Sequence, residues 1–457
     1  MTICSRLALA LLVVALVVIS PVPATHAQVF TQTGIGSAGA NLRDIVVCSP
    51  APCTLPNVQV SRSKVSATAS NLATNPNNPL QMIIGVEAPG CLADGGTYST
   101  SDGGSTWTKS CLPQLDPIYV DGTPSLVYDN HGVVHALTTL FNLDDGEDPT
   151  YESHSTDNGL TWSALTLAVP TVPFSVSALD HAVADNSPAS PFAGRIYASV
   201  QQYRSPLASV TVSRSTDGGA TWRLALAATL PKTQGLFSEG FSHLAVGKDG
   251  TVYLAWMASD NGTFSPNNMM FAKSTDGGVT WSTPVLVYSA TAVNSLPNTS
   301  IFLPDSPVIA VDTSGGAFSG RLYMTFFNFT GAFMQVLVTQ SADGGSTWST
   351  PVPVAPPTAT RDQFLPWISV GPDGSASVTW LDRRDDPANV SYRTYLAFSK
   401  DGGVSWGRNI PLAKAMSQPT NGDHFAVNAW VGSTLFAVWP SMKTGGSLQE
   451  VLGGFIP

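Results

Sequence analysis

An eight-residue box recurs six times along this chain, and this repetition limits the possible folds more than any other feature. One copy reads STDGGATW at Ser215–Trp222, and another reads STDGGVTW at Ser274–Trp281. The steps between successive box aspartates are 55, 60, 59, 67 and 58 residues. A period of this size predicts a repeat architecture, in which stacked units share one continuous core. The aspartates of the six copies are Asp102, Asp157, Asp217, Asp276, Asp343 and Asp401.

Each box belongs to a longer unit of four short apolar segments. In the fifth unit two alternating apolar runs, Pro307–Asp312 and Gly320–Phe327, are joined by a turn rich in glycine and serine. A third run, Met334–Gln340, leads into the box, and Thr350–Ala355 leaves it. Alternating runs of this length, separated by turn residues, predict an antiparallel sheet of four strands.

The box itself has the residues of a hairpin turn. Gly218 and Gly219 can adopt positive φ without a Cβ penalty. The carboxylate of Asp217 can accept hydrogen bonds from turn amides and from the Thr221 hydroxyl, and Trp222 can pack between sheets. We therefore interpret the box aspartates as structural, repeated because the sheet is repeated.

Seven first-strand segments stand against six boxes. The seventh unit ends before its fourth strand, and a strand from the N-terminal segment 28–64 would complete it. We therefore predict an all-β fold, a β-propeller of seven four-stranded antiparallel blades over residues 65–457, closed by that N-terminal strand. Six blades is the alternative. The seven segments begin near Ser66, Pro124, His181, Ser242, Pro307, Pro366 and His424.

Residues 1–27 have the pattern of a secretory signal peptide. Arg6 precedes an apolar run from Leu7 to Ile19, and small residues end the segment at Ala27. We expect cleavage there and a secreted, periplasmic or cell-surface protein; a single membrane anchor is the alternative. The mature chain then has 20 basic and 31 acidic residues, a net charge of −11. We expect no nucleic-acid partner, because phosphate binding needs many Lys and Arg, and no membrane insertion after cleavage.

The mature chain keeps four cysteines, all in its first quarter. An even number of cysteines in an exported chain favours disulfides over free thiols. Three pairings are possible, and the pairing of neighbours joins Cys48 to Cys53 and Cys91 to Cys111. A metal site is the alternative, although no histidine accompanies these cysteines in the sequence.

The motif Ser/Thr-x-Asp-x-Gly-x-Thr-Trp resembles the Asp-box (BNR repeat) of the sialidase superfamily, and the resemblance covers about residues 65–457. It implies a carbohydrate-directed propeller. Sialidases hold the sugar carboxylate with three arginines, and they use a tyrosine nucleophile and an aspartate as acid/base. Their first arginine lies in an Arg-Ile-Pro motif, which this sequence lacks; the arginines nearest to that place are Arg43 and Arg62. No catalytic residue can therefore be assigned by motif.

Position within the repeat gives a second route to a site. In a propeller the connections between sheets, and those between second and third strands, share one face around the channel. The box turns lie on the other face. Acids precede six of the seven first strands, and Asp180, Asp305 and Asp362 are candidates for acid/base catalysis. Local turn bonding is the alternative role. The six acids are Asp121, Asp180, Glu239, Asp305, Asp362 and Asp423.

Few arginines fall on the same predicted face. Arg204, Arg361, Arg383 and Arg384 are candidates for an anion clamp, and Tyr392 is the candidate nucleophile beside them. Surface pairing with the neighbouring aspartates of the DRRDD segment is the alternative. By contrast, Arg195 and Arg321 recur at equivalent repeat positions and are interpreted as structural.

No cofactor is required by this chemistry. The oxygen-rich stretch Asn142–Asp148 makes Ca²⁺ a possible ligand, although its spacing departs from that of an EF-hand. The seven histidines show no metal-ligand spacing, and His181, His243 and His424 are expected to be packed or bonded in turns.

Two functions follow as hypotheses. One is a sialidase-like exo-glycosidase that acts on terminal acidic sugars of extracellular glycans or glycoproteins. The other is a non-catalytic propeller that binds a glycan or a protein. Convergence of three arginines in one pocket would separate the two.

Overall fold

The structure, a computed structural model, describes most of the chain after residue 55, and every regular element in this part is a β-strand. No helix that could span a membrane occurs among the described residues. They are 56–61, 68–87, 91, 95–115, 119–121, 124–142, 148–170, 176–204, 207–230, 242–259, 267–291, 293, 295–299, 303, 306–419, 425–442 and 449–456.

The strands form seven antiparallel sheets, which we number blades 1 to 7 in chain order. Blade 1 contains β2 (Thr68–Thr74), β3 (Met82–Glu87), β4 (Gly95–Thr100) and β5 (Thr108–Cys111), and blade 2 contains β6 (Tyr119–Asp121), β7 (Ser125–Tyr128), β8 (Val134–Asn142), β9 (Thr150–Ser155) and β10 (Thr166–Val169). Blade 3 contains β11 (Val176–Ala184), β12 (Ile196–Arg204), β13 (Leu207–Ser215) and β14 (Arg223–Leu230), and blade 4 contains β15 (His243–Val246), β16 (Val252–Ser259), β17 (Asn267–Ser274) and β18 (Val285–Ala290). Blade 5 contains β19 (Val308–Val311), β20 (Leu322–Phe329), β21 (Met334–Ser341) and β22 (Val352–Pro353), and blade 6 contains β23 (Gln363–Val370), β24 (Ala376–Asp382), β25 (Arg393–Ser399) and β26 (Ile410–Pro411). Blade 7 contains β27 (Val427–Val431), β28 (Thr434–Met442) and β29 (Gln449–Ile456) together with β1 (Val58–Gln59).

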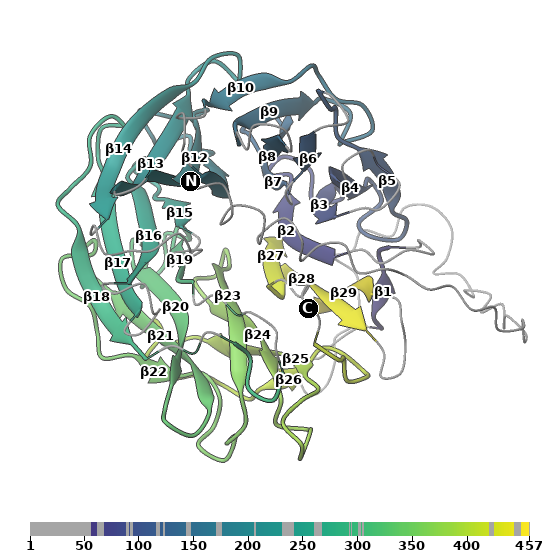
Figure 1. Ribbon diagram of the computed structural model, residues 1–457, viewed down its shortest axis with the longest axis vertical. Helices are drawn as coiled ribbons and strands as arrows, with labels where there is room; N and C mark the ends of the chain where they lie inside the picture. The colour runs from purple at the N-terminus through teal and green to yellow at the C-terminus, as the bar shows by residue number, and fades with distance from the viewer. Residues whose placement is uncertain are drawn as a thin grey trace, which may run out of the picture. The chain divides into compact units, whose positions relative to one another are not determined.

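The seven sheets stand around a ring, which Figure 1 shows end-on. The inner strands β2, β7, β11, β15, β19, β23 and β27 each contact the next, and β2 also contacts β27, so the ring is closed. The fold is the predicted seven-bladed β-propeller, and the six-bladed alternative is wrong. Blade 2 is irregular, because its second strand β8 pairs with both β6 and β7.

Ring closure uses the two ends of the described chain. β1 is the outer strand of blade 7 and pairs with β29, with Val58 opposite Gly453 and Gln59 opposite Leu452. The backbone amide of Val60 continues the pairing to Val451, and the Val60 side chain is fully buried. The predicted closure by an N-terminal strand is confirmed.

Each box forms the turn after the third strand of its blade. In all six copies one oxygen of the aspartate accepts a hydroxyl hydrogen bond of 2.5–2.6 Å from the Thr or Ser four residues later. Its other oxygen accepts the hydroxyl of the box's first Ser or Thr at 2.7–2.8 Å. Gly218 and Gly219 have φ values of 66° and 89°, a conformation that suits glycine. These are the hydrogen bonds and turn geometry that the sequence predicts.

The box carboxylates make stability depend on pH. The Thr161 hydroxyl, followed by its backbone amide, lowers the pKa of Asp157 to about 2, and Thr347 does the same for Asp343. The pKa values of the other four box aspartates are also lowered. Because the ordinary value is 3.8, this stabilisation is complete above that pH and is lost as the pH falls toward 2. Urea unfolding at about pH 5 and about pH 3 should show a lower unfolding free energy at the lower pH. An equal value at both would contradict this role, and Asp157→Asn should weaken the dependence.

One disulfide lies in the described residues. Cys91 is bonded to Cys111, the last residue of β5, with their Cα atoms 5.4 Å apart. This predicted pair is confirmed. Cys48 and Cys53, the other predicted pair, lie outside the described residues.

Boxes also join neighbouring blades. The second glycine of a box lies against the preceding blade: Gly345 faces the Phe271 ring, and Gly403 faces Tyr323. Cationic side chains of the preceding blade donate hydrogen bonds to box carbonyls, as Arg195 does to Gly277 at 2.8 Å and Arg321 to Gly402 at 3.2 Å. The structural interpretation of these two arginines is therefore confirmed.

Candidate functional site

The predicted acid Asp362 and the predicted clamp residue Arg383 meet at the channel-face end of blade 6. Asp362 precedes β23, and Arg383 follows β24. Their side chains are 1% and 0% exposed, with 3.3 Å between the Arg383 Nη1 and Asp362 Oδ2 atoms. The other Asp362 oxygen accepts the Met334 amide at 2.9 Å, and Arg383 also donates to the Pro297 carbonyl at 2.7 Å. This buried pair ties blades 5 and 6 and the connection between blades 4 and 5 together.

Arg384 is also held by its own blade, although it is less buried. Its guanidinium contacts Asp382 at 2.5 Å and lies 4.3 Å above the Tyr395 ring. The Tyr395 hydroxyl donates to Asp385 at 2.8 Å. Burial, with the Asp385 carboxylate next, raises the pKa of Tyr395 to about 12, so this phenol stays protonated at neutral pH.

The remaining candidates of blade 6, Tyr392 and Arg361, lie near the Asp362–Arg383 pair. Tyr392 is 1% exposed, and its ring meets Phe364 edge-on with 5.9 Å between the centroids. Arg361 is half-buried, and its Nη2 lies 3.4 Å from the Pro387 carbonyl. The structure thus brings Arg361, Asp362, Arg383 and Tyr392 into one region, with Arg361 nearest to solvent. We call these four residues and the neighbouring Arg384 the blade 6 cluster.

For the other predicted catalytic and sugar-binding residues, Asp180, Arg204 and Asp305, the structure does not describe the side chains. Asp180 lies within β11, at an irregularity between Leu179 and His181, rather than before that strand as the sequence suggested. Arg204 is the last residue of β12, opposite Leu207. Asp305, Glu239 and Asp423 lie outside the described residues, as does most of the Asn142–Asp148 stretch proposed for calcium.

The inner strands carry a cluster of aromatic rings. His181 and His243 stack with their ring centroids 3.7 Å apart, and the Trp367 ring lies 4.9 Å from His243. Phe425 extends the cluster, because its ring meets Trp367 edge-on with 5.7 Å between the centroids. Burial lowers the pKa of His181 to about 3, and burial followed by its neighbour His181 lowers that of His243. Both imidazoles are neutral packing groups, as the sequence predicted; His424 lies outside the described residues.

A pocket of about 580 Å³ lies between blades 6 and 7 on the box face. Blade 7 has no box, so no turn covers this part of blade 6 as boxes cover the earlier blades. The half-buried rings of Phe398 and Trp430 line the pocket, and the exposed cations Lys400 and Arg408 stand at it. Its size and its mixture of aromatic and polar groups suit a small ligand.

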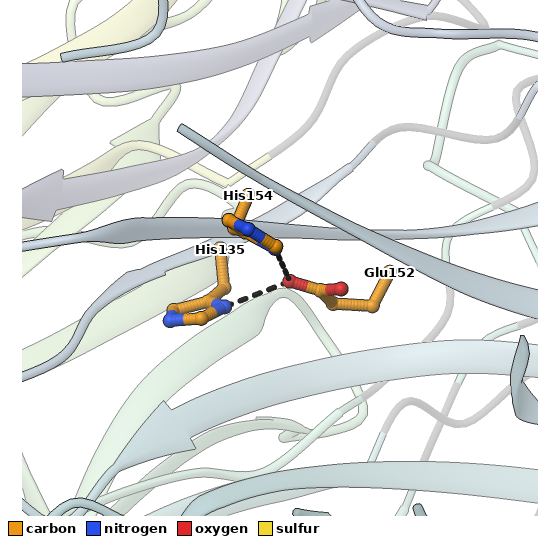
Figure 2. A group of neighbouring side chains, drawn as sticks. All are labelled: His135, Glu152 and His154. Carbon is orange, nitrogen blue, oxygen red and sulfur yellow. Dashed lines mark hydrogen bonds and ion pairs between the residues drawn. The ribbon is translucent and has the colours of Figure 1, made fainter. Parts of the chain in front are cut away.

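Sequence reasoning missed a second group of polar residues, on β8 and β9. Figure 2 shows His135 and His154 pointing at the Glu152 carboxylate, with nitrogen–oxygen distances of 2.7 and 3.4 Å to Oε1. Burial lowers the pKa of His135, but the nearby carboxylates of Asp129 and Glu152 outweigh it and the pKa is raised. The histidines are 19 residues apart, a spacing that indicates no metal site until the hairpin pairs them.

Known proteins resemble this chain in sequence and in fold. It is 27% identical over 266 residues to a sialidase of Micromonospora viridifaciens; the match covers 53% of this chain and 36% of that sialidase, so the chain spans about a third of its relative. No family model matches the sequence.

Among solved structures, a Hadza microbial sialidase is 15% identical with a TM-score of 0.48, over 69% of this chain and 63% of its own. The leech intramolecular trans-sialidase complexed with 2,7-anhydro-Neu5Ac is 13% identical with a TM-score of 0.47, over 76% and 68%. Similarity at this level concerns the fold alone and carries no argument about activity. This chain is a seven-bladed β-propeller, and in its repeated boxes and its sequence it is similar to a sialidase.

Proposed function

We propose that this protein is an exported, carbohydrate-directed propeller that acts as a sialidase-like exo-glycosidase on terminal acidic sugars of extracellular glycans. The observation that carries the proposal is the 266-residue similarity to a sialidase, together with the six boxes. The signal-peptide pattern of residues 1–27 supports export. The net negative charge of the mature chain disfavours binding to nucleic acid.

Binding of the sugar carboxylate would fall to Arg361 and Arg384, the less buried arginines of the blade 6 cluster, with Arg204 from blade 3. The buried Asp362–Arg383 pair would hold the loop that presents them. Asp180 and Asp305 remain candidates for acid/base catalysis, and Tyr392 for the nucleophile. Ca²⁺ bound at Asn142–Asp148 remains a proposal as well.

A non-catalytic glycan-binding function is the second candidate, and the pocket between blades 6 and 7 favours it. Aromatic faces such as those of Phe398 and Trp430 pack on the C–H faces of sugar rings, while Lys400 and Arg408 complement a sugar carboxylate. This function would need none of the buried groups of blade 6.

A fluorogenic sialoside assay and calorimetry with sialyllactose test both functions on the same purified protein. For the enzyme, we expect turnover by the wild type and a loss of about tenfold or more in Arg361→Lys and Arg384→Lys, because lysine keeps the charge but loses the guanidinium fork. Trp430→Ala serves as the matched control, since it lies on the other face and should leave turnover unchanged.

The binding function gives the opposite pattern. Sialyllactose would bind without turnover, Trp430→Ala would weaken the affinity about tenfold, and the two lysine variants would bind as the wild type does. A wild type that neither turns over sialosides nor binds sialyllactose would eliminate both candidates.

A further inference from the structure

Blade 2 departs from the other blades at the place where each blade meets the next box. The second residue of the second strand pairs there with the residue just before the box serine or threonine. In blades 3, 4 and 5 a tyrosine pairs with an arginine, a lysine or a glutamine, and two of these long side chains reach the next box. In blade 2 the pair is His135 with His154. The pairs in the other blades are Ile83–Ser99, Tyr197–Arg214, Tyr253–Lys273, Tyr323–Gln340 and Ser377–Phe398.

A third substitution accompanies the two histidines. Glu152 lies three residues before the box serine, a position that Val212, Phe271 and Val338 occupy in blades 3 to 5. Its side chain is 0% exposed, and its Oε2 atom has no hydrogen-bond partner among the described residues. A fully buried carboxylate oxygen without a hydrogen-bond partner is costly, so a cation bound to this carboxylate would be favoured.

The three side chains converge on one point. The nitrogens of His135 and His154 lie 2.7 and 3.4 Å from Glu152 Oε1, and one atom from each residue fits within 4.8 Å of the others (Figure 2). Ligand atoms around tetrahedral zinc are about 3.4 Å apart, so the set needs only small rotations to hold a metal ion. His154 is 38% exposed, which leaves a path for the ion and room for a water ligand.

Asp129 supplies the outer partner that metal-binding histidines usually have. Its Oδ2 atom lies 3.7 Å from the far nitrogen of His135, while its Oδ1 accepts the amides of His131 and Val133 at 2.9 Å. A carboxylate in this place orients the imidazole toward the metal. Together Glu152 and Asp129 carry two negative charges, which one divalent cation balances.

We propose that His135, Glu152 and His154 bind a divalent transition-metal ion, with Zn²⁺ as the best match, and that Asp129 orients His135 in this site. Two imidazole nitrogens and one carboxylate favour Zn²⁺ over Ca²⁺, which prefers oxygen ligands. The site lies on the box face between blades 2 and 3, where Gly219 of the third box covers Glu152. It is separate from the blade 6 cluster and does not depend on glycan binding.

Calorimetry with Zn²⁺ on the full chain, first dialysed against a chelator, tests the proposal. We expect one equivalent of Zn²⁺ to bind at this site with a dissociation constant of roughly micromolar or below, and excess Ca²⁺ not to compete with it. His154→Gln and Glu152→Gln should weaken zinc binding at least tenfold, and Asp129→Asn by about 10–100-fold. Zn²⁺ should also raise the melting temperature of the wild type, by mass action, and not that of these variants.

His131→Ala is the matched control, because His131 lies beside Asp129 but is 76% exposed and outside the ligand set; it should bind zinc as the wild type does. Should Glu152→Gln fail to fold, the more exposed His154→Gln still decides the question. The proposal is overturned if the wild type takes up no zinc, or if His154→Gln binds it with unchanged affinity; the three residues would then form a buried ion cluster only.

Discussion

Arg383→Leu should destabilise the protein by about 3–5 kcal/mol, the usual result of removing one partner from a buried ion pair. The substitution leaves Asp362 1% exposed and without the guanidinium that lies 3.3 Å from it. It also removes the hydrogen bond to the Pro297 carbonyl, which joins the connection between blades 4 and 5 to blade 6. Urea unfolding followed by tryptophan fluorescence measures the loss.

Arg361→Leu is the control for this experiment, because Arg361 is half-buried and makes one weak contact at 3.4 Å. The double variant Arg383→Leu/Asp362→Asn should recover part of the loss, since no unpaired buried charge remains. If Arg383→Leu unfolds at the same urea concentration as the wild type, Arg383 is not the structural residue described above. Binding of the sugar carboxylate would then be the favoured role of Arg383.

Gly345→Ala should cost about 2–5 kcal/mol through two separate effects. The glycine has a φ of 86°, where an L-residue is strained by about 1–2 kcal/mol. An alanine Cβ would also lie 2.1 Å from Cε1 of Phe271, whose ring is buried at 2% exposure, and moving such a ring costs about 1–3 kcal/mol. The melting temperature and the urea midpoint should both fall.

Gly218→Ala isolates the first of these effects. Gly218, the first glycine of its box where Gly345 is the second, has a φ of 66°, but its added Cβ would meet nothing within 4 Å. We expect only the backbone term there, about 1–2 kcal/mol. Equal losses in the two variants would show that box glycines serve the turn alone and that the packing between blades does not depend on them.

Much of the fold could be predicted because its information is local and repeated. The hydrogen bonds of Asp217 join residues four apart or fewer, so the turn geometry of the box can be predicted from its eight residues alone. The seventh blade followed from arithmetic, since seven first strands need seven sheets and the last one lacked a strand. Blade 2 was harder, because the split of its inner strand into β6 and β7 leaves no mark in the alternation of residues.

The candidate site was less predictable, because it depends on contacts between distant segments. Arg383 and Asp362 were placed on the correct end of the blade, but their burial depends on Pro297 and Met334 from other segments. His135 and His154 become neighbours only when β8 and β9 pair in register. A comparison of equivalent positions across the repeats would have found them, since tyrosine and basic or amide side chains occupy these positions in blades 3 to 5.

The pairing of β1 with β29 also shapes how the protein reaches its fold. Val58 and Gly453 are 395 residues apart, and bringing such distant residues together in a fully unfolded chain would cost roughly 5 kcal/mol in chain entropy. Six blades are built from neighbouring hairpins and can form as the chain is made, whereas blade 7 needs both ends. Until it forms, the outer edge of β29 offers unpaired backbone groups to any other strand. Before blade 7 closes, this edge can therefore pair with a strand of another copy of the chain. Pairing of β1 with β29 removes the exposed edge and so protects the protein against such association.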